Sequence, residues 1–303
     1  MDYTIHKDRI IIENPEYFRA RDILTCGQVF RYKQTLDGWE VRSGAKLARI
    51  IEVNGKVEII TSDPQYFANY FDFNTDYRKI IKDIIQKFLS KIEGCPRNEG
   101  GECDKTPSAT IIQKSCEYGK GIRILKGELE EIIFSFIISA NNNIKRIQGI
   151  IERLCARYGE PAEGGYAFPS AERLAEAEEG ELKSLGLGYR APYIIKTAKI
   201  LLNGNAATIP TLHTLCSTSE ARKELLKLPG VGPKVADCIL LFGLGRTDVF
   251  PVDTWIERVA REDFSIDTAN KEDARKYFLE LFGNFAGYAQ QYLFYYKRNA
   301  IQY

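Results

Sequence analysis

The run Leu228-Pro-Gly-Val-Gly-Pro-Lys-Val-Ala-Asp-Cys238 predicts two helices joined by a tight hairpin. Residues 220–227 have helical character and form the first helix. Gly230 and Gly232 permit the positive φ that such a hairpin requires. The second helix is expected to begin near Pro233, because proline is tolerated in a first helical turn.

A lysine and an aspartate stand where this hairpin brings two side chains to one cleft. Lys234 lies in the first turn of the second helix, and Asp253 follows after 253 − 234 = 19 residues. The helix dipole disfavours an ammonium in a first turn, so Lys234 is suited to act as a neutral amine. The structural alternatives are a lysine that touches a phosphate and an aspartate that caps a helix over residues 254–262. The segment therefore fits both an enzyme and a hairpin that only grips phosphates.

The composition is that of an ordinary globular protein, with 44% hydrophobic and 27% charged residues in a chain of 303, and this length predicts two or three domains. No apolar run approaches the ~18 residues of a membrane span, and no signal-peptide pattern is present, so we expect an intracellular protein without a membrane partner. The 7 cysteines are scattered and odd in number, which favours a reducing compartment, and 2 histidines argue against a histidine metal site. At a net charge of +1, a DNA-binding face requires segregated Lys and Arg side chains.

Residues 3 to about 62 predict strands and most of the remainder predicts helices, so the expected fold class is α+β. Asn54-Gly55 between two β-branched runs is a hairpin signal, which favours an antiparallel sheet. The strands are expected at residues 9–13, 29–32, 39–42, 47–53 and 56–61. Helices are expected within residues 64–92 and at residues 128–139, 143–158, 170–176, 181–185, 192–202, 271–282 and 287–300.

The order of these elements predicts two domains. An N-terminal antiparallel sheet domain is expected over residues 1–118, followed by an all-α helix-hairpin-helix domain over residues 119–303. Residues 94–108 are rich in Gly, Pro and charge, and they predict a loop. Cys95 and Cys103 in this loop are two conceivable metal ligands, but a plain surface loop is the better interpretation.

The segment from Leu228 to Asp253, taken with the sheet-then-helix order, resembles the helix-hairpin-helix DNA glycosylases of the HhH-GPD superfamily, and in particular the 8-oxoguanine DNA glycosylase/AP lyase family. The resemblance implies excision of 8-oxoguanine, opposite cytosine, from double-stranded DNA by a monomer in the bacterial nucleoid or the eukaryotic nucleus. It also implies strand cleavage by β-elimination through a lysine Schiff base. A monofunctional glycosylase for alkylated bases and a noncatalytic DNA-binding hairpin protein are the alternatives.

The resemblance assigns roles to the two residues of the hairpin cleft. Lys234 matches the Schiff-base lysine of the family, and Asp253 matches the aspartate that caps a helix and supports positive charge on the sugar. Gly230 and Gly232 belong to the hairpin that contacts DNA.

Two further segments match those that contact DNA around the lesion. Asn141-Asn-Asn-Ile-Lys-Arg146 matches the segment that fills the gap left by the flipped base, with Asn141 entering the stack and Arg146 binding the orphaned cytosine. One of the three asparagines also fits a helix N-cap. Leu185-Gly-Leu-Gly-Tyr-Arg190 predicts an exposed wedge in which Tyr189 unstacks bases and Arg190 helps to hold the partner base. A simple helix C-cap at its glycines is the structural alternative.

The resemblance also places a pocket for the damaged base. Cys238 and Phe294 would sandwich the base, and Gln290, four residues before Phe294 on one helix face, would read its Watson–Crick edge. Cys238 and Phe294 also fit ordinary core positions. Gly27 matches the glycine whose carbonyl accepts the N7–H of 8-oxoguanine, although a strand glycine often marks only a bulge.

The sequence differs from its relatives in two respects, and its hairpin is a conceivable ion site. Trp255 stands where eukaryotic relatives have histidine, so its sugar-phosphate contact must differ. Because no cysteine follows Cys238, the iron–sulfur cluster of endonuclease III-type relatives is not expected, and neither is any other cofactor. Backbone carbonyls of residues 228–233 are a conceivable site for a monovalent cation, as in relatives.

Overall fold

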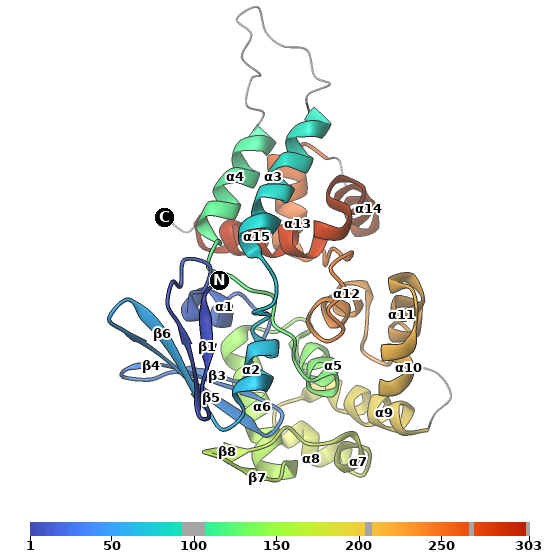
Figure 1. Ribbon diagram of the computed structural model, residues 1–303. Coiled ribbons are helices and arrows are strands. Elements are labelled where there is room, and N and C mark those ends of the chain that lie inside the picture. Colours follow the sequence, from blue (N-terminus) through green and yellow to red (C-terminus); the bar gives the residue numbers. More distant parts are fainter. Residues whose placement is uncertain (93–106, 204–207, 267–269, 301–303) are drawn as a thin grey trace, which may run out of the picture.

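The computed structural model describes residues 1–92, 107–203, 208–266 and 270–300. Its fold is α+β, as predicted, with an antiparallel sheet followed by helices (Figure 1). The sheet has the strand order β1-β2-β6-β5-β4-β3. Its strands are β1 (Tyr3–Ile5), β2 (Arg9–Ile12), β3 (Tyr32–Gln34), β4 (Gly38–Ser43), β5 (Lys46–Val53) and β6 (Lys56–Thr61).

The expected hairpin turn is present between β5 and β6. Asn54 and Gly55 both have positive φ, at 52° and 75°, which matches the twist of the two paired strands. Alternate residues of the sheet, such as Ile50 and Ile59, are fully buried against α1 (Ala20–Thr25) and α2 (Pro64–Tyr70). The sheet therefore has one apolar face, and short helices cover it.

The strand predicted at residues 29–32 is wrong, because β3 begins only at Tyr32 and a helix, α1, precedes it. The chain between them is a buried loop. The Gln28 side chain satisfies its polar groups by donating to the carbonyls of Ile23 and Arg123, at 2.9 and 2.8 Å, and accepting from the Leu125 N–H at 2.9 Å. These contacts hold the start of the loop against α1 and the segment of residues 123–125 without a strand ladder.

One group of helices combines elements from both ends of the chain (Figure 1). Phe88, Ile112 and Phe278, from three of these helices, lie in the same buried cluster. The domain boundary near residue 118 stays a prediction, but α3 and α4, which precede it, share a core with the C-terminal helices rather than with the sheet. The group consists of α3 (Tyr77–Ile92), α4 (Pro107–Tyr118), α13 (Thr254–Arg258), the π-helical turn η2 (Val259–Asp263), α14 (Lys271–Phe282), the turn η3 (Gly283–Phe285) and α15 (Ala286–Asn299).

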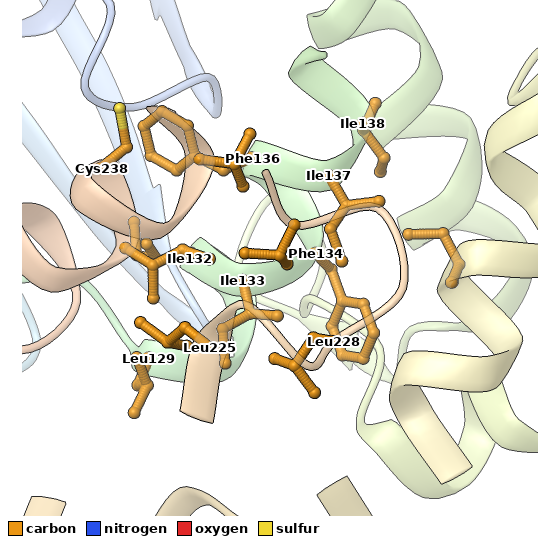
Figure 2. Close-up of a cluster of buried hydrophobic side chains, with 14 of the residues drawn as sticks. Leu129, Ile132, Ile133, Phe134, Phe136, Ile137, Ile138, Leu225, Leu228 and Cys238 are labelled. Carbon is orange, nitrogen blue, oxygen red and sulfur yellow. The ribbon is translucent and has the colours of Figure 1, made fainter. Parts of the chain in front are cut away.

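The second group of helices packs around α5 (Leu129–Ser139), the most apolar helix (Figure 2). Phe134 and Ile137 of α5 lie in one cluster with Leu225 and Leu228, so the hairpin is anchored on α5 (Figure 2). The other elements of this part are α6 (Ile144–Tyr158), β7 (Pro161–Ala162), β8 (Gly165–Tyr166), α7 (Ala171–Ala175), α8 (Glu179–Ser184), η1 (Gly188–Arg190), α9 (Ala191–Leu202), α10 (Ile209–Thr214), α11 (Thr218–Leu225) and α12 (Pro233–Phe242).

The two hairpin helices agree with the prediction, apart from a shift in the first. Helix α12 begins at Pro233, as predicted, whereas α11 begins at Thr218 because Ser217 and Glu220 form a capping box. Helix α4 begins at Pro107, so the predicted loop ends before it, and Cys95 and Cys103 lie outside the described residues. Within the described ranges, no helix is both long and apolar enough to cross a membrane.

Candidate active site

A pocket of about 530 Å³ opens between the hairpin, the loop after α5 and the start of α13. It brings together Lys234, Asp253, Asn141, Gly230 and Gly232, which come from three separate segments of the sequence. The pocket therefore joins both predicted catalytic residues with three of the predicted DNA-binding residues.

Lys234 is half-buried in the first turn of α12. Its Nζ lies 5.1 Å from the ring centroid of Phe136, and its ammonium interacts with the thiol of Cys238 one turn further on. Burial raises the pKa of the Cys238 thiol to about 11, although the charge of Lys234 and a hydrogen bond to it act in the opposite direction. Cys238 is therefore a neutral thiol beside the amine, at the edge of the apolar cluster (Figure 2).

Asp253 is the N-cap of α13, as predicted. Its Oδ1 accepts hydrogen bonds from the N–H groups of Trp255 and Ile256, at 3.0 and 2.9 Å. Burial raises the pKa of this carboxyl above its ordinary value, while the Ile256 N–H and the Lys234 charge oppose the shift. Among the described residues, no hydrogen bond involves Oδ2, so one carboxylate oxygen stays available to charge in the pocket.

An ion cluster in the wall of the pocket was not foreseen. Asp237, fully buried and three residues after Lys234, binds Arg222 of α11 and Arg275 of α14, each at 2.7 Å, and Glu272 binds both arginines. Burial raises the pKa of Asp237 and the two guanidinium groups oppose the shift. The cluster holds the hairpin helices against α14, and a lone aspartate in the apolar run of α12 was its sequence signal.

The loop after α5 presents a free asparagine. Asn141 is exposed and has a φ of +50°, while Asn143 caps α6 by accepting from the Arg146 N–H at 3.0 Å. Arg146 is exposed in the first turn of α6. The asparagine that was expected to act as the N-cap is thus Asn143, and Asn141 projects from the loop.

The wedge segment differs from the expectation at one residue. Tyr189 is 53% exposed, as predicted, but Arg190 is only 3% exposed, so the predicted exposure of Arg190 is wrong. Its guanidinium donates to the carbonyls of Ala140 and Asn141, at 3.0 and 3.1 Å, and lies 4.3 Å from the Tyr189 ring centroid. Arg190 therefore ties the wedge to the asparagine loop, about 50 residues earlier in the chain.

The hairpin approaches α9 closely at one glycine. A Cβ at Gly230 would lie 2.9 Å from Cδ2 of Tyr193, and its φ is +84°, so only glycine fits. Gly232 is exposed and has open space where a Cβ would be, immediately before α12. The backbone of this turn is therefore accessible to a phosphate at the N-terminus of α12.

The predicted base-reading residues lie outside the 530 Å³ pocket. Gly27 has a φ of +87° and follows α1 rather than lying in a strand, and a Cβ there would stand 3.6 Å from Cε1 of Phe294. Gln290 is 5% exposed, and its Oε1 is buried without a hydrogen-bond partner among the described residues. An unpartnered amide oxygen beside this aromatic ring is suited to a ligand group.

Helix α15 also holds the segment that carries Gly27, which the sequence did not reveal. Gln291 donates to the Cys26 carbonyl at 2.9 Å, Tyr295 to Asp22 at 2.8 Å and Arg298 to the Thr25 carbonyl. These residues recur at helical spacing, on the face next to that of Gln290 and Phe294. One helix thus fixes Gly27 relative to Gln290 and Phe294.

A metal site is not apparent in the parts of the chain that the structure describes, where no three His, Cys, Asp or Glu side chains converge on a point. Trp255 stacks with Arg258, whose Cζ lies 5.3 Å from the ring centroid. An indole and a guanidinium therefore stand at the position where a histidine was noted in eukaryotic relatives.

Two family models match the chain in succession. The 8-oxoguanine DNA glycosylase N-terminal domain matches residues 10–133, and the HhH-GPD superfamily base excision DNA repair protein matches residues 134–284.

Two of the curated proteins with related sequences are named as an N-glycosylase/DNA lyase and a probable N-glycosylase/DNA lyase. An N-glycosylase/DNA lyase of Saccharomyces cerevisiae is 40% identical over 171 residues, which are 52% of this chain and 45% of the yeast protein. A probable N-glycosylase/DNA lyase of Methanothermobacter thermautotrophicus is 33% identical over 221 residues, which are 65% of this chain and 68% of that protein. The match thus spans about half of the yeast relative and two thirds of the archaeal one.

Solved structures match over almost the whole chain. Clostridium acetobutylicum 8-oxoguanine glycosylase/lyase, in complex with double-stranded DNA containing cytosine opposite 8-oxoG, has a TM-score of 0.85 at 33% identity, over 99% of each chain. Its apo-form has a TM-score of 0.83 at 32% identity, over 98% of this chain and 100% of that chain.

Proposed function

Because the chain belongs to the 8-oxoguanine DNA glycosylase family of the HhH-GPD superfamily, we propose that it excises 8-oxoguanine, opposite cytosine, from double-stranded DNA and then cleaves the strand as an AP lyase. The observation that carries this proposal is the pocket in which Lys234 and Asp253 meet. A hairpin that only gripped phosphates would not require a half-buried carboxylate in the same pocket as the lysine.

Lys234 acts as the nucleophile in this proposal. Its amine nitrogen bonds to C1′ of the sugar as the bond from C1′ to the base breaks, and the base leaves with the electron pair. Opening of the sugar ring gives a Schiff base between Nζ and C1′. Loss of a C2′ proton then expels the 3′ phosphate, which breaks the strand.

Asp253 supports this chemistry electrostatically. Positive charge develops on the sugar as the base departs, and a carboxylate in a low-dielectric pocket stabilises it. Oδ1 accepts the two N–H groups of the helix cap, so Oδ2 is the oxygen that stabilises the charge on the sugar. The neutral Cys238 thiol lies beside the amine and offers an uncharged surface to the base.

The base is bound by residues on three segments, namely the loop after α1, α12 and α15. The Gly27 carbonyl accepts the N7–H that guanine lacks, Gln290 reads the Watson–Crick edge, and the base lies between Phe294 and Cys238. The buried, unpartnered Oε1 of Gln290 and the contact between Gly27 and Phe294 support this assignment.

The duplex is held from the asparagine loop and the hairpin. Asn141 fills the gap left by the base, Tyr189 unstacks the pairs, Arg146 binds the orphaned cytosine, and Gly230 and Gly232 contact the backbone. Exposure of Asn141, Arg146 and Tyr189 supports these roles. The carbonyl contacts of Arg190 support a different role, in which it positions this loop before DNA arrives.

Four minor points complete the proposal: the protein is intracellular, it acts as a monomer, it needs no cofactor, and the hairpin holds a monovalent cation. Carbonyl oxygens are suitable ligands for such an ion. The carbonyls of Leu228 and Pro229 already accept from Val231 N–H and Thr197 Oγ1, both at 3.0 Å, and each has a second lone pair for an ion.

Borohydride trapping tests the proposal. The protein is incubated with a duplex containing 8-oxoguanine opposite cytosine in the presence of borohydride, which reduces a Schiff base to a permanent bond. A covalent complex is expected with the wild type and none with Lys234→Gln, whose strand cleavage should fall by on the order of a thousandfold or more. Lys227→Gln, at an exposed lysine that pairs with Glu224, is the matched control and should be trapped normally.

The other outcomes identify the alternatives. Base release without trapping would point to a monofunctional glycosylase, and DNA binding without release would point to a noncatalytic hairpin protein. Normal trapping of Lys234→Gln would assign the nucleophile to another residue.

A further inference from the structure

Arg298, in the last turn of α15, stands where Gly27 and Phe294 meet. Its Nη2 donates to the Thr25 carbonyl, and its guanidinium carbon lies 5.0 Å from the Phe294 ring centroid. Its Nη1 lies 3.5 Å from the position that a Gly27 Cβ would occupy. Among the described residues no hydrogen bond involves Nη1, so this side chain is anchored through Nη2 and has its Nη1 donors free beside the glycine.

The lesion differs from guanine at two adjacent atoms. Oxidation at C8 adds a hydrogen to N7, which becomes a donor, and a carbonyl oxygen to C8, which becomes an acceptor. A site that reads both atoms needs an acceptor and a donor next to one another. The Gly27 carbonyl supplies the acceptor under the function proposed above, and Arg298 is the cationic donor at the same glycine.

We propose that Arg298 is a specificity-determining residue whose Nη1 donates a hydrogen bond to the C8 oxygen of 8-oxoguanine. This inference rests on the proposed function and adds a second reader of the lesion to it. Arginine suits the role because its donors are rigidly arranged, so the group that holds Thr25 also fixes the direction of the free donor. Stacking on Phe294 limits the guanidinium further, on the ring against which the base would lie.

Two substrates distinguish a hydrogen bond from Arg298 to the base from a role in which Arg298 only supports the Gly27 segment. One duplex carries 8-oxoguanine and the other carries 8-thioguanine, both opposite cytosine. The thione keeps the N7 hydrogen but replaces the C8 oxygen with sulfur, a weaker acceptor. Single-turnover base release is measured for the wild type and for Arg298→Leu with each duplex.

The wild type should prefer the oxo substrate. Arg298→Leu should release 8-oxoguanine roughly ten- to a hundredfold more slowly, the loss expected for a charged hydrogen bond, and should change release of 8-thioguanine much less. The oxo-to-thio rate ratio should therefore fall. An equal loss on both substrates, or no loss on either, would overturn the proposal, since Arg298 would then only support Thr25 or do nothing.

Controls separate this result from misfolding and from failure of the proposed function. A duplex with an abasic site has no base for Arg298 to contact. Its cleavage therefore measures whether Arg298→Leu is folded and competent as a lyase. Arg261→Leu, at an arginine 66% exposed in its side chain, is the matched control and should leave the ratio unchanged. If the wild type neither releases 8-oxoguanine nor traps with borohydride, the proposed function fails, and that result does not depend on Arg298.

Discussion

The two halves of the site are built in different ways. Lys234 and Asp253 come from one stretch of the chain, 253 − 234 = 19 positions apart, and share one pocket. Gly27 and Phe294 come from opposite ends of the chain, and the contacts that hold them together span 265 to 273 residues. The reacting groups are thus positioned by local sequence, and the base-reading groups by tertiary packing.

This difference predicts how each half responds to change. In the hairpin half, a substitution should alter the chemistry whatever base is bound. In the α15 half, a substitution should alter which base is accepted and should spare reaction at an abasic site. The following changes test this division, beginning with the largest expected loss of activity.

Asp253→Asn tests the hairpin half. Asparagine keeps an oxygen that caps α13 but removes the negative charge near the sugar, so single-turnover release of 8-oxoguanine should fall roughly a hundred- to a thousandfold. Thermal unfolding should change little. Asp248→Asn, at an exposed aspartate bonded to Thr218, is the control. Full activity of Asp253→Asn would show that the carboxylate serves only as a cap.

Arg146→Ala tests discrimination by a residue outside both halves. A bidentate contact between an arginine and a base edge discriminates by about 1–3 kcal/mol, so the preference for cytosine opposite the lesion should weaken roughly tenfold or more. Release rates with each of the four opposite bases measure it. Lys145→Ala, at the exposed neighbouring residue, should preserve the preference. A wild type indifferent to the opposite base would refute the assignment of Arg146.

Tyr295→Phe tests the grip of α15 on the Gly27 segment. It removes the hydrogen bond to Asp22, at 2.8 Å, and leaves the ring in place. A loss of about 1 kcal/mol should slow 8-oxoguanine release roughly fivefold, while cleavage at an abasic site persists. Tyr296→Phe, at the next residue of the same helix, is the control. Equal losses on both substrates would contradict the division between the halves.

Glu131 lies outside both halves of the site, and the expected effect of Glu131→Gln is on stability. Burial raises the pKa of Glu131 to about 7, against 4.5 for a free glutamate, although Arg31 and the Gly44 N–H oppose the shift. The folded protein therefore holds a proton between these pH values that the unfolded chain lacks, and stability should rise as the pH falls from 8 to 5, by on the order of 3 kcal/mol.

Denaturant unfolding of the wild type and Glu131→Gln at several pH values measures this contribution. The variant should lack that rise. Its free energy of unfolding should therefore change less between pH 5 and pH 8 than that of the wild type. A parallel pH dependence of both proteins would assign the effect to other groups, while activity of the variant should stay near that of the wild type.

The same division explains what the sequence predicted. Elements that depend on neighbours in the chain were correct, such as the start of α12 at Pro233, the hairpin at Asn54 and the cap at Asp253. Helix α1 was missed because side chains that bind Asp22 and Thr25 in it lie 273 residues away, on α15.

Contacts between distant segments account for the remaining differences. Arg190 was expected to be exposed because two glycines precede it, but the carbonyls that bury it belong to a loop about 50 residues earlier. The ion cluster around Asp237 needs arginines from α11 and α14. A periodic pattern marks one face of a helix, but it does not identify the segment that packs there.

The guanidinium of Arg190 also has a thermodynamic consequence. Its bonds to the Ala140 and Asn141 carbonyls order the asparagine loop in the free protein, and its stacking orders Tyr189. The conformational entropy of these two insertion elements is therefore lost during folding rather than during association. DNA would meet the asparagine loop and Tyr189 at a fixed spacing, so a larger share of the contact energy is left to bend the duplex and extrude a base.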